Sequence, residues 1–164
     1  MVLATGLAGM GMAIWLQPKD EQRIQSRLDG LTAALSHDRP VDEAWNTKLR
    51  AAVEHGVASS LTLEIAEGPD GEWTQAEIIR AAFQLGQRDS ALGLQTQGVT
   101  VKVDAKAGLA QAGGDVLVRR VLANGRVDLR QRQFAATLLE DDGDWRLEAL
   151  QLAPERHDQP EARP

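Results

Sequence analysis

The sequence contains no cysteine and no tyrosine, and only three of its 164 residues are histidines. The absence of cysteine excludes disulfides, thiolate catalysis and cysteine-bound metals. Catalysis would have to draw on a small stock of Asp, Glu, His, Ser and Thr. No residue pair has the spacing of a metal site, and no glycine-rich loop follows a strand to hold a phosphate. We therefore expect no metal and no cofactor.

Basic charge is also scarce. The chain carries 18 Lys and Arg against 24 Asp and Glu, which gives a formal net charge of -6. Nucleic-acid binding needs a clustered basic surface, so nucleic acid is not expected as a partner. The length is that of one domain and is sufficient to bury a core without disulfides or metals.

One hydrophobic run opens the chain, and no charged residue lies between Val2 and Leu16. The run is slightly shorter than the about 17 to 20 apolar residues that a bilayer core needs. No Lys or Arg precedes it and no small-residue cleavage site follows it, which is atypical of a signal peptide. We expect residues 1–17 to form an uncleaved membrane anchor, with residues 2–16 in the bilayer. A signal-like segment and a buried or disordered terminus are the alternatives.

Two amphipathic helices are predicted after this run. Asp20 is expected to cap the first, whose apolar residues recur at spacings of four, three and four. These residues are Ile24, Leu28, Leu31 and Leu35. The second helix carries Trp45 and Leu49 and is expected to end near Gly56, a residue type common at helix C-termini.

A half-buried strand and a third helix follow. Leu61, Leu63 and Ile65 alternate with polar residues, which predicts a strand with one buried face. Thr74 and Glu77 have the spacing of a capping box, which predicts that a helix begins there.

Long strands make up the rest of the body. The dipeptide Asn124-Gly125 predicts a two-residue hairpin turn. Three strands change the phase of their apolar alternation, as an extra bulged residue would cause, and bulges bend sheets. The changes lie near Gly98, after Leu129 and after Leu147. We predict an α+β fold in which the N-terminal helices pack on a strongly bent antiparallel sheet.

This order of elements resembles the NTF2-like (nuclear transport factor 2, SnoaL-like) superfamily. The stretch "DEQRIQSRLDGLTAALS" resembles the first helix of bacterial members, "GEWTQAEIIRAA" resembles the entry to the third helix, and "DDGDWRLEALQL" resembles the closing hairpin. The resemblance implies a cone-shaped NTF2-like domain over residues 20–153, preceded by a hydrophobic N-terminal helix. The polar, proline-containing stretch 154–164 is expected to be a disordered tail.

The resemblance also bears on location and assembly. Bacterial relatives with one hydrophobic segment ahead of this domain are similar to envelope-anchored proteins, which implies a single-pass anchor in the inner membrane and a domain in the periplasm. Lys19, Arg23 and Arg27 follow the segment, however, and the positive-inside rule read literally places the domain in the cytoplasm. The resemblance further implies a homodimer formed through the sheet.

Enzymes of the superfamily place Asp, His and Tyr in a pocket at the open end of the cone. The Tyr-plus-Asp arrangement of isomerase-type members cannot be transferred, because this chain has no Tyr. A His/acid pair of the dehydratase type would here join His55 to an acid such as Glu64. A solvent-facing His at a helix end is the competing interpretation. Trp45, Trp73 and Phe83 are candidates for pocket walls or for core residues.

An arginine cluster is the other candidate binding site. With a two-residue turn, Arg119 is expected to face Arg130, and Arg132 to lie two residues further along the same face. Val118 and Leu129 are then expected to line the core. Like charges placed opposite each other are unfavourable, so the cluster requires acidic neighbours or an anionic ligand. The candidate neighbours are Asp128 and Glu148.

Three functions remain open at this point. The first, which we favour, is a non-catalytic, envelope-anchored NTF2-like domain that binds a protein partner or a small apolar ligand. The second is a small-molecule isomerase or dehydratase that uses the cone pocket. The third is an assembly or secretion accessory module that docks through its membrane segment.

Overall fold

The computed structural model describes residues 19–155, so the predicted anchor over 1–17 lies outside the described residues. The elements along the chain are α2 (Asp20–Leu35), α3 (Glu43–Gly56), β1 (Val57–Ile65), β2 (Asp70–Thr74), α4 (Gln75–Gly86), β3 (Asp89–Asp104), β4 (Leu109–Leu122), β5 (Val127–Asp141) and β6 (Asp144–Leu152). Within these residues, no helix combines the length and hydrophobicity needed to span a bilayer.

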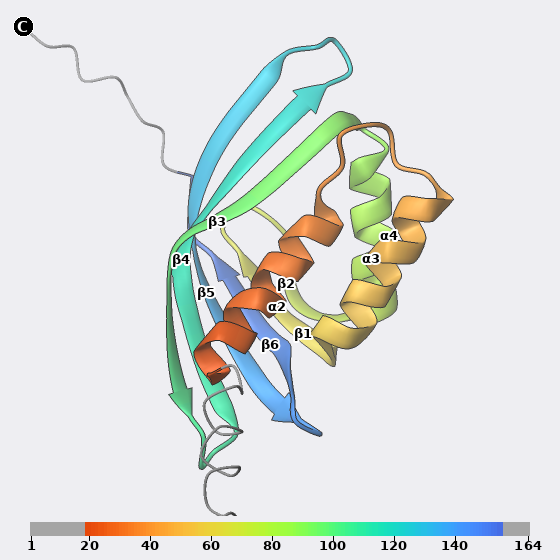
Figure 1. Ribbon diagram of the computed structural model, residues 1–164. Helices are drawn as coiled ribbons and strands as arrows, with labels where there is room; N and C mark the ends of the chain where they lie inside the picture. Colours follow the sequence, from red (N-terminus) through yellow and green to blue (C-terminus); the bar gives the residue numbers. More distant parts are fainter. Residues whose placement is uncertain (1–18, 156–164) are drawn as a thin grey trace, which may run out of the picture.

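The strands form one six-stranded sheet in the order β2-β1-β6-β5-β4-β3. The three helices lie on one side of this strongly bent sheet, and the upper part of the β4–β5 hairpin projects past them (Figure 1). We call the face that meets the helices the inner face and the opposite one the outer face. The predicted α+β cone is confirmed, with one difference in detail: β1 pairs with β6 in the parallel sense, so the sheet is mixed.

Two bulges bend the sheet where the alternation was predicted to change phase. β3 has one extra residue opposite β4 between Gln97 and Thr100, and Gly98 there adopts a φ of 59° that favours glycine. β6 has one extra residue between Leu147 and Ala149, opposite β5. Both predicted changes are therefore confirmed.

The third predicted bulge, within β5, does not form, so that prediction is wrong. β4 and β5 pair without any irregularity, so alternate residues of β5 keep to one face along its whole length. Val127 and Leu129 lie on the outer face, 48% and 72% exposed, whereas Phe134 lies on the inner face and is buried. The expected place of Leu129 in the core is therefore also wrong.

The length of the β4–β5 hairpin turn explains why the predicted pairing of these two strands is wrong. Its backbone hydrogen bond from the N–H of Leu122 to the carbonyl of Arg126 leaves three residues in the turn instead of the predicted two. The third, Gly125, has a φ of 80°, which is typical of a three-residue turn closed by a glycine bulge. The pairing shifts by one residue, and the expected pair of Arg119 with Arg130 does not form.

The helix ends follow the sequence signals with one exception. Thr74 and Glu77 form the predicted capping box, and α3 ends at Gly56. Asp20 is not a cap but the first helical residue, and the N-cap position belongs to Lys19. The Asp20 carboxylate instead accepts a hydrogen bond from the indole of Trp145, on β6, at 3.3 Å.

The core fills the space between the helices and the inner face. The largest fully buried side chains are Trp145, Ile24, Leu49 and Leu138. The predicted stripe of α2 is confirmed, because Ile24 and Leu28 are buried and Leu31 and Leu35 pack against the same cluster. The interior of the cone is thus occupied by hydrophobic side chains.

Gly114 allows the bent strand β3 to approach β4, and its substitution should be costly. A Cβ at Gly114 would lie 2.8 Å from the carbonyl oxygen of Gln97 and 3.1 Å from the Cα of Val99, both backbone atoms at the bulge. We expect Gly114→Ala to lower the free energy of unfolding by about 2 kcal/mol, measured by urea denaturation.

Gly113→Ala is the matched control. A Cβ at Gly113 would have the carbonyl oxygen of Phe134 as its nearest neighbour, at 3.5 Å, which is ordinary contact. The control should change stability by no more than about 0.5 kcal/mol. Equal losses in the two variants would contradict a steric limit at the bulge.

Candidate functional site

The predicted arginines are divided between the two faces of the sheet. Arg119 lies opposite Leu129 on the outer face. Arg130 and Arg132 lie on the inner face, on the same alternation as the buried Phe134. Arg130 and Arg132 therefore share a face, and Arg119 lies on the other one, although Arg119 and Arg130 both line one cavity of about 650 Å³.

Near the turn of the β4–β5 hairpin, Asp89 at the start of β3 and Arg120 on β4 form a bidentate pair. The guanidinium donates from Nε and Nη2 to the two carboxylate oxygens, at 2.8 and 3.0 Å. Asp89 is only 8% exposed. The Arg120 hydrogen bonds hold the pKa of the Asp89 carboxyl below its usual range, and the same pairing raises the pKa of Arg120. A carboxylate held ionised in this way is a poor proton donor.

Arg130 and Arg132 also have acidic partners. Arg130 donates to Asp128 at 2.8 Å, and Glu155 accepts from Arg130 with one oxygen and from Arg132 with the other. Asp128 is a predicted neighbour, but the second partner is Glu155 instead of the expected Glu148. We call this group the mouth network: Asp89, Arg120, Asp128, Arg130, Arg132 and Glu155. Its three arginines are matched by three carboxylates, which does not favour an anionic ligand.

Two of the candidate pocket-wall residues, Trp45 and Phe83, lie close together. Their ring centroids are 6.4 Å apart, and His37 meets Trp45 edge-on at 5.8 Å. The Trp45 indole donates to the carbonyl of Ser36 at 3.2 Å. Trp73 lies elsewhere, on the edge strand β2 opposite Leu61. The aromatic side chains therefore do not line one pocket.

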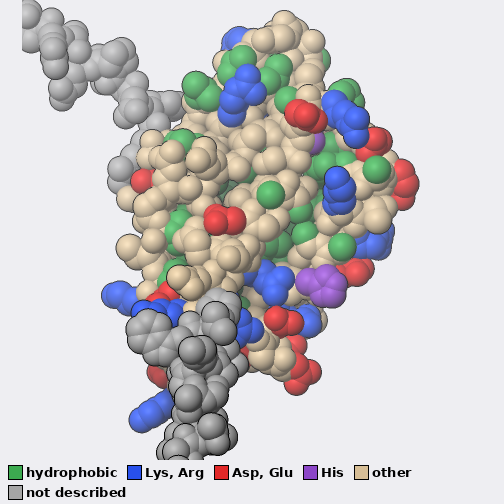
Figure 2. Space-filling model, in the orientation of Figure 1, with side chains coloured by type: hydrophobic (Ala, Val, Ile, Leu, Met, Phe, Trp, Pro, Cys, Tyr) green, Lys and Arg blue, Asp and Glu red, His purple; other side chains and the backbone are tan. Residues whose placement is uncertain are grey.

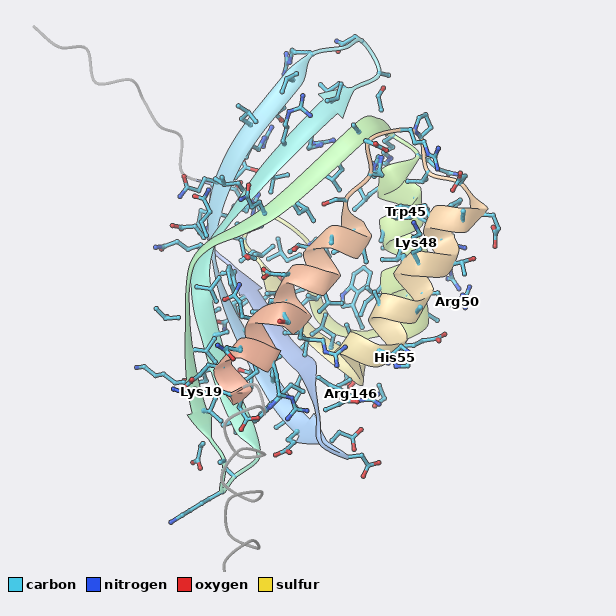
Figure 3. All side chains as sticks on the ribbon, in the orientation of Figure 1. Lys19, Trp45, Lys48, Arg50, His55 and Arg146 are labelled. Atoms are coloured by element: carbon cyan, nitrogen blue, oxygen red, sulfur yellow. The ribbon has the colours of Figure 1, made fainter. Side chains whose placement is uncertain are left out.

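The proposed His/acid pair does not form. His55 is exposed at the C-terminal end of α3, and Figure 3 places it toward the opposite end of that helix from Trp45. Glu64 lies on the outer face, where it accepts a hydrogen bond from Gln151 at 2.7 Å. The catalytic pair considered from the sequence is therefore wrong.

The outer face carries a groove of about 910 Å³. Its floor includes the backbone of Gly98, Gly113 and Gly114, beside the β3 bulge. Four acidic residues line it, which are Glu64, Glu67, Asp70 and Asp115. We call this cavity the outer groove.

Exposed hydrophobic side chains lie near the tip of the hairpin on the same outer face. Val127 and Leu129 are exposed, and Arg119 lies opposite Leu129. We call these three residues the hairpin patch. Figure 2 shows hydrophobic and basic side chains together at the upper end of the molecule, where Figure 1 places the β4–β5 hairpin.

The sequence matches no protein-family model and no curated protein. Solved structures do share its fold. An NTF2-like superfamily protein from Salmonella enterica has a TM-score of 0.64 at 11% identity, over 87% of this chain and 96% of that one. A protein labelled a candidate scytalone dehydratase, from Novosphingobium aromaticivorans, has a TM-score of 0.60 at 12% identity, over 92% of this chain and 91% of that one.

A further similar structure is labelled a candidate dehydratase of the NTF2-like family, from Streptomyces avermitilis. It has a TM-score of 0.63 at 11% identity and covers 82% of this chain and 95% of its own. Likeness at this level of identity establishes the fold and not the activity. The chain has the NTF2-like fold, as the order of its elements predicted.

Sequence reasoning missed the Asp89–Arg120 pair and the outer groove. The pair depends on the β3–β4 register, which a bulge offsets near Asp89 as well as at Gly98. The groove gathers residues from β1, β3, β4 and β6 with the loop after β1, so no local pattern marks it. A carboxylate at the start of a long strand was the only signal for Asp89.

The mouth network predicts a specific acid sensitivity. Hydrogen bonds from Arg130 and Arg132 lower the pKa of Glu155 from 4.5 to about 2. The stabilisation is therefore complete above about pH 4.5 and is lost as the pH falls toward 2. Glu155→Gln should lower the free energy of unfolding at neutral pH, and its difference from the parent protein should shrink as urea titrations move from pH 6 to pH 3.

Glu148→Gln is the control, because Glu148 forms no ion pair within residues 19–155. Its difference from the parent should stay near zero throughout. A Glu155→Gln difference that does not change with pH would show that the pair contributes no charge-dependent stability.

Proposed function

We propose that this chain is a non-catalytic NTF2-like domain that binds a protein partner through the outer face of its sheet. One observation supports this most directly: hydrophobic side chains fill the inside of the cone, whereas the outer face carries a groove and exposed hydrophobic residues. The alternative of a small apolar ligand needs a cavity. The filled core offers no space for one, and a separate cavity of about 650 Å³ beside Leu117, Val118 and Leu129 is the candidate place.

The enzyme alternative has weaker support. Two similar structures carry a dehydratase label, but their identity to this chain is 12% and 11%. In this chain His55 and Glu64 lie apart, and Asp89 is fixed by Arg120. A general base must be a proton acceptor that lies within hydrogen-bond reach of a bound substrate. These residues do not provide such a base.

The first partner we propose is a second copy of the chain, bound through the hairpin patch. Exposed Val127 and Leu129 lie on a regularly paired hairpin, whose outer face can pack against the sheet of a second copy. Burying such side chains against a second copy would stabilise a dimer by the hydrophobic effect.

Substitution in the hairpin patch tests this. Leu129→Asp should convert a dimer to a monomer in analytical ultracentrifugation at micromolar concentration, because a buried unpaired carboxylate would replace a hydrophobic contact. At protein concentrations below the dimer dissociation constant, the melting temperature of Leu129→Asp should match that of the parent protein.

Leu85→Asp is the matched control, because Leu85 is 56% exposed but lies on α4, on the helix side of the sheet and not on its outer face. It should leave the dimer intact. A parent protein that is monomeric at all concentrations, or one that both variants dissociate equally, would overturn the dimer proposal.

We also propose that the hydrophobic run between Val2 and Leu16 anchors the domain at the bacterial inner membrane, with the domain in the periplasm. The absence of charged residues from the run supports the anchor. The periplasmic side rests only on the resemblance to envelope-anchored relatives, because the positive-inside rule read literally favours the cytoplasm. An anchor would hold the domain close to envelope partners.

Cell fractionation with a topology reporter tests the anchor. The full chain, fused after Pro164 to a reporter active only outside the cytoplasm, should sediment with membranes and give a signal. Deletion of residues 2–16 should release the product into the soluble fraction without signal. A soluble, silent full-length fusion would contradict both the anchor and the periplasmic location.

A further inference from the structure

We propose that a cavity beside the β4–β5 hairpin binds a small amphipathic carboxylate, of the class of a medium-chain fatty acid. The cavity has a volume of about 650 Å³ and is lined by residues of β3, β4 and β5 together with Glu155. We call it the hairpin cavity. The proposal goes beyond the binding of a protein partner and does not depend on a dimer, because one copy of the chain supplies all of these residues.

The lining of the hairpin cavity includes two neighbouring rows of cross-strand pairs on the outer face. One row is Gly93–Arg119–Leu129, and the next is Gln95–Leu117–Gln131. Gly93 has no side chain, so the first row is open at its β3 end. A Cβ placed on Gly93 would meet no atom of another strand nearer than the Cβ of Arg119, at 3.8 Å. Space for a ligand therefore remains over Gly93.

Hydrophobic side chains provide walls for the apolar part of a ligand. Leu117 and Leu129 belong to the two rows, and Leu94 and Val118 also line the cavity. None of these four side chains is part of the core cluster of the described residues, and Leu129 is 72% exposed. Small-molecule sites are mostly apolar and measure about 300 to 1,000 Å³. The hairpin cavity has that size, and a hydrocarbon chain would cover its exposed apolar surface.

One positive charge in the hairpin cavity is not compensated. The charged lining residues are Arg119, Asp128, Arg130 and Glu155. Arg130 is paired with both Asp128 and Glu155. Arg119 forms no ion pair within residues 19–155. An anion can therefore bind Arg119 without breaking an existing pair.

The chemistry of Arg119 favours a carboxylate that carries one negative charge. A guanidinium donates two parallel hydrogen bonds to the two oxygens of a carboxylate. More highly charged anions are disfavoured, because Asp128 and Glu155 also line the cavity and would repel them. Arg119 lies between Gly93 and Leu129 in its row. A carboxylate bound to Arg119 would thus have the open space on one side and a hydrophobic wall on the other.

Isothermal titration calorimetry with octanoate and 1-octanol tests the proposal, because the two probes share a chain length and differ in charge. Octanoate should bind the parent protein about fivefold more tightly than octanol, since only octanoate forms a charge-assisted contact. Arg119→Gln should weaken octanoate binding about fivefold and change octanol binding by less than about twofold. A parent protein that does not bind octanoate would overturn the proposal.

Arg126→Gln is the matched control, because Arg126 is exposed in the hairpin turn and is not a lining residue of the cavity. It should change octanoate binding by less than about twofold, since an exposed charge outside the site is screened. Equal weakening by Arg119→Gln and Arg126→Gln would overturn the proposal, because general attraction to basic residues of the hairpin would then explain the binding.

Gly93→Val tests the shape of the site. Its side chain should occupy the space over Gly93 and weaken the binding of both probes at least about tenfold. The melting temperature should match that of the parent protein, because the added Cβ makes only ordinary contact. Unchanged binding of both probes to this variant would overturn the proposal.

A last variant separates the hairpin cavity from the proposed dimer. Val127 belongs to the hairpin patch but does not line the cavity. Val127→Ser should therefore leave octanoate binding within about twofold of the parent, even where ultracentrifugation shows that it weakens the dimer. Loss of octanoate binding with Val127→Ser would assign the site to the contact between two copies and overturn the proposal. A parent protein that binds octanoate as a monomer would contradict only the dimer, so the two proposals fail separately.

Discussion

The contact between the bulge in β3 and the bare backbone of Gly114 is the constraint on which the rest of the structure depends. Gln97 and Val99 approach Gly114 so closely that a side chain there would collide with backbone. This contact lets β3 bend, so that Val99, Val101 and Val103 can pack on the core shared with the helices while the hairpin projects past them. The same glycines form the floor of the outer groove. One steric condition thus shapes both the filled inside of the cone and the hollow on its outside.

The charged side chains on the two faces of the sheet differ in whether they form ion pairs. In the mouth network on the inner side, every arginine is paired with a carboxylate. The three carboxylates are half-buried or buried. Partly buried charges need such pairing because desolvation without a partner is costly. The outer groove leaves its carboxylates without ion partners among the described residues, next to open solvent. Charges of the first kind stabilise the fold, whereas Glu64, Glu67 and Asp70 in the outer groove are exposed to solvent.

Most of the fold could be predicted from the sequence, but little of the candidate site could be. The α2 stripe and the Thr74–Glu77 capping box are local patterns within one or two helical turns, so their outcome does not depend on distant contacts. The candidate residues came from residue type alone. His55 and Glu64 were joined by analogy, and the structure separates them to different sides of the sheet.

By itself, the sequence determined the three helices, five of the six strands and two of the bulges, because side-chain periodicity and glycine conformation act over short distances. The short edge strand β2 was not predicted. Only the tertiary structure decided which residues meet across strands. A third residue in the turn before Arg126 moved the β4–β5 pairing by one position and placed Arg119 beside Leu129. The tertiary structure also brought Asp115 of β4 and Glu64 of β1 to one groove. Register and the meeting of distant strands depend on the sum of many weak contacts, which no short stretch of sequence contains.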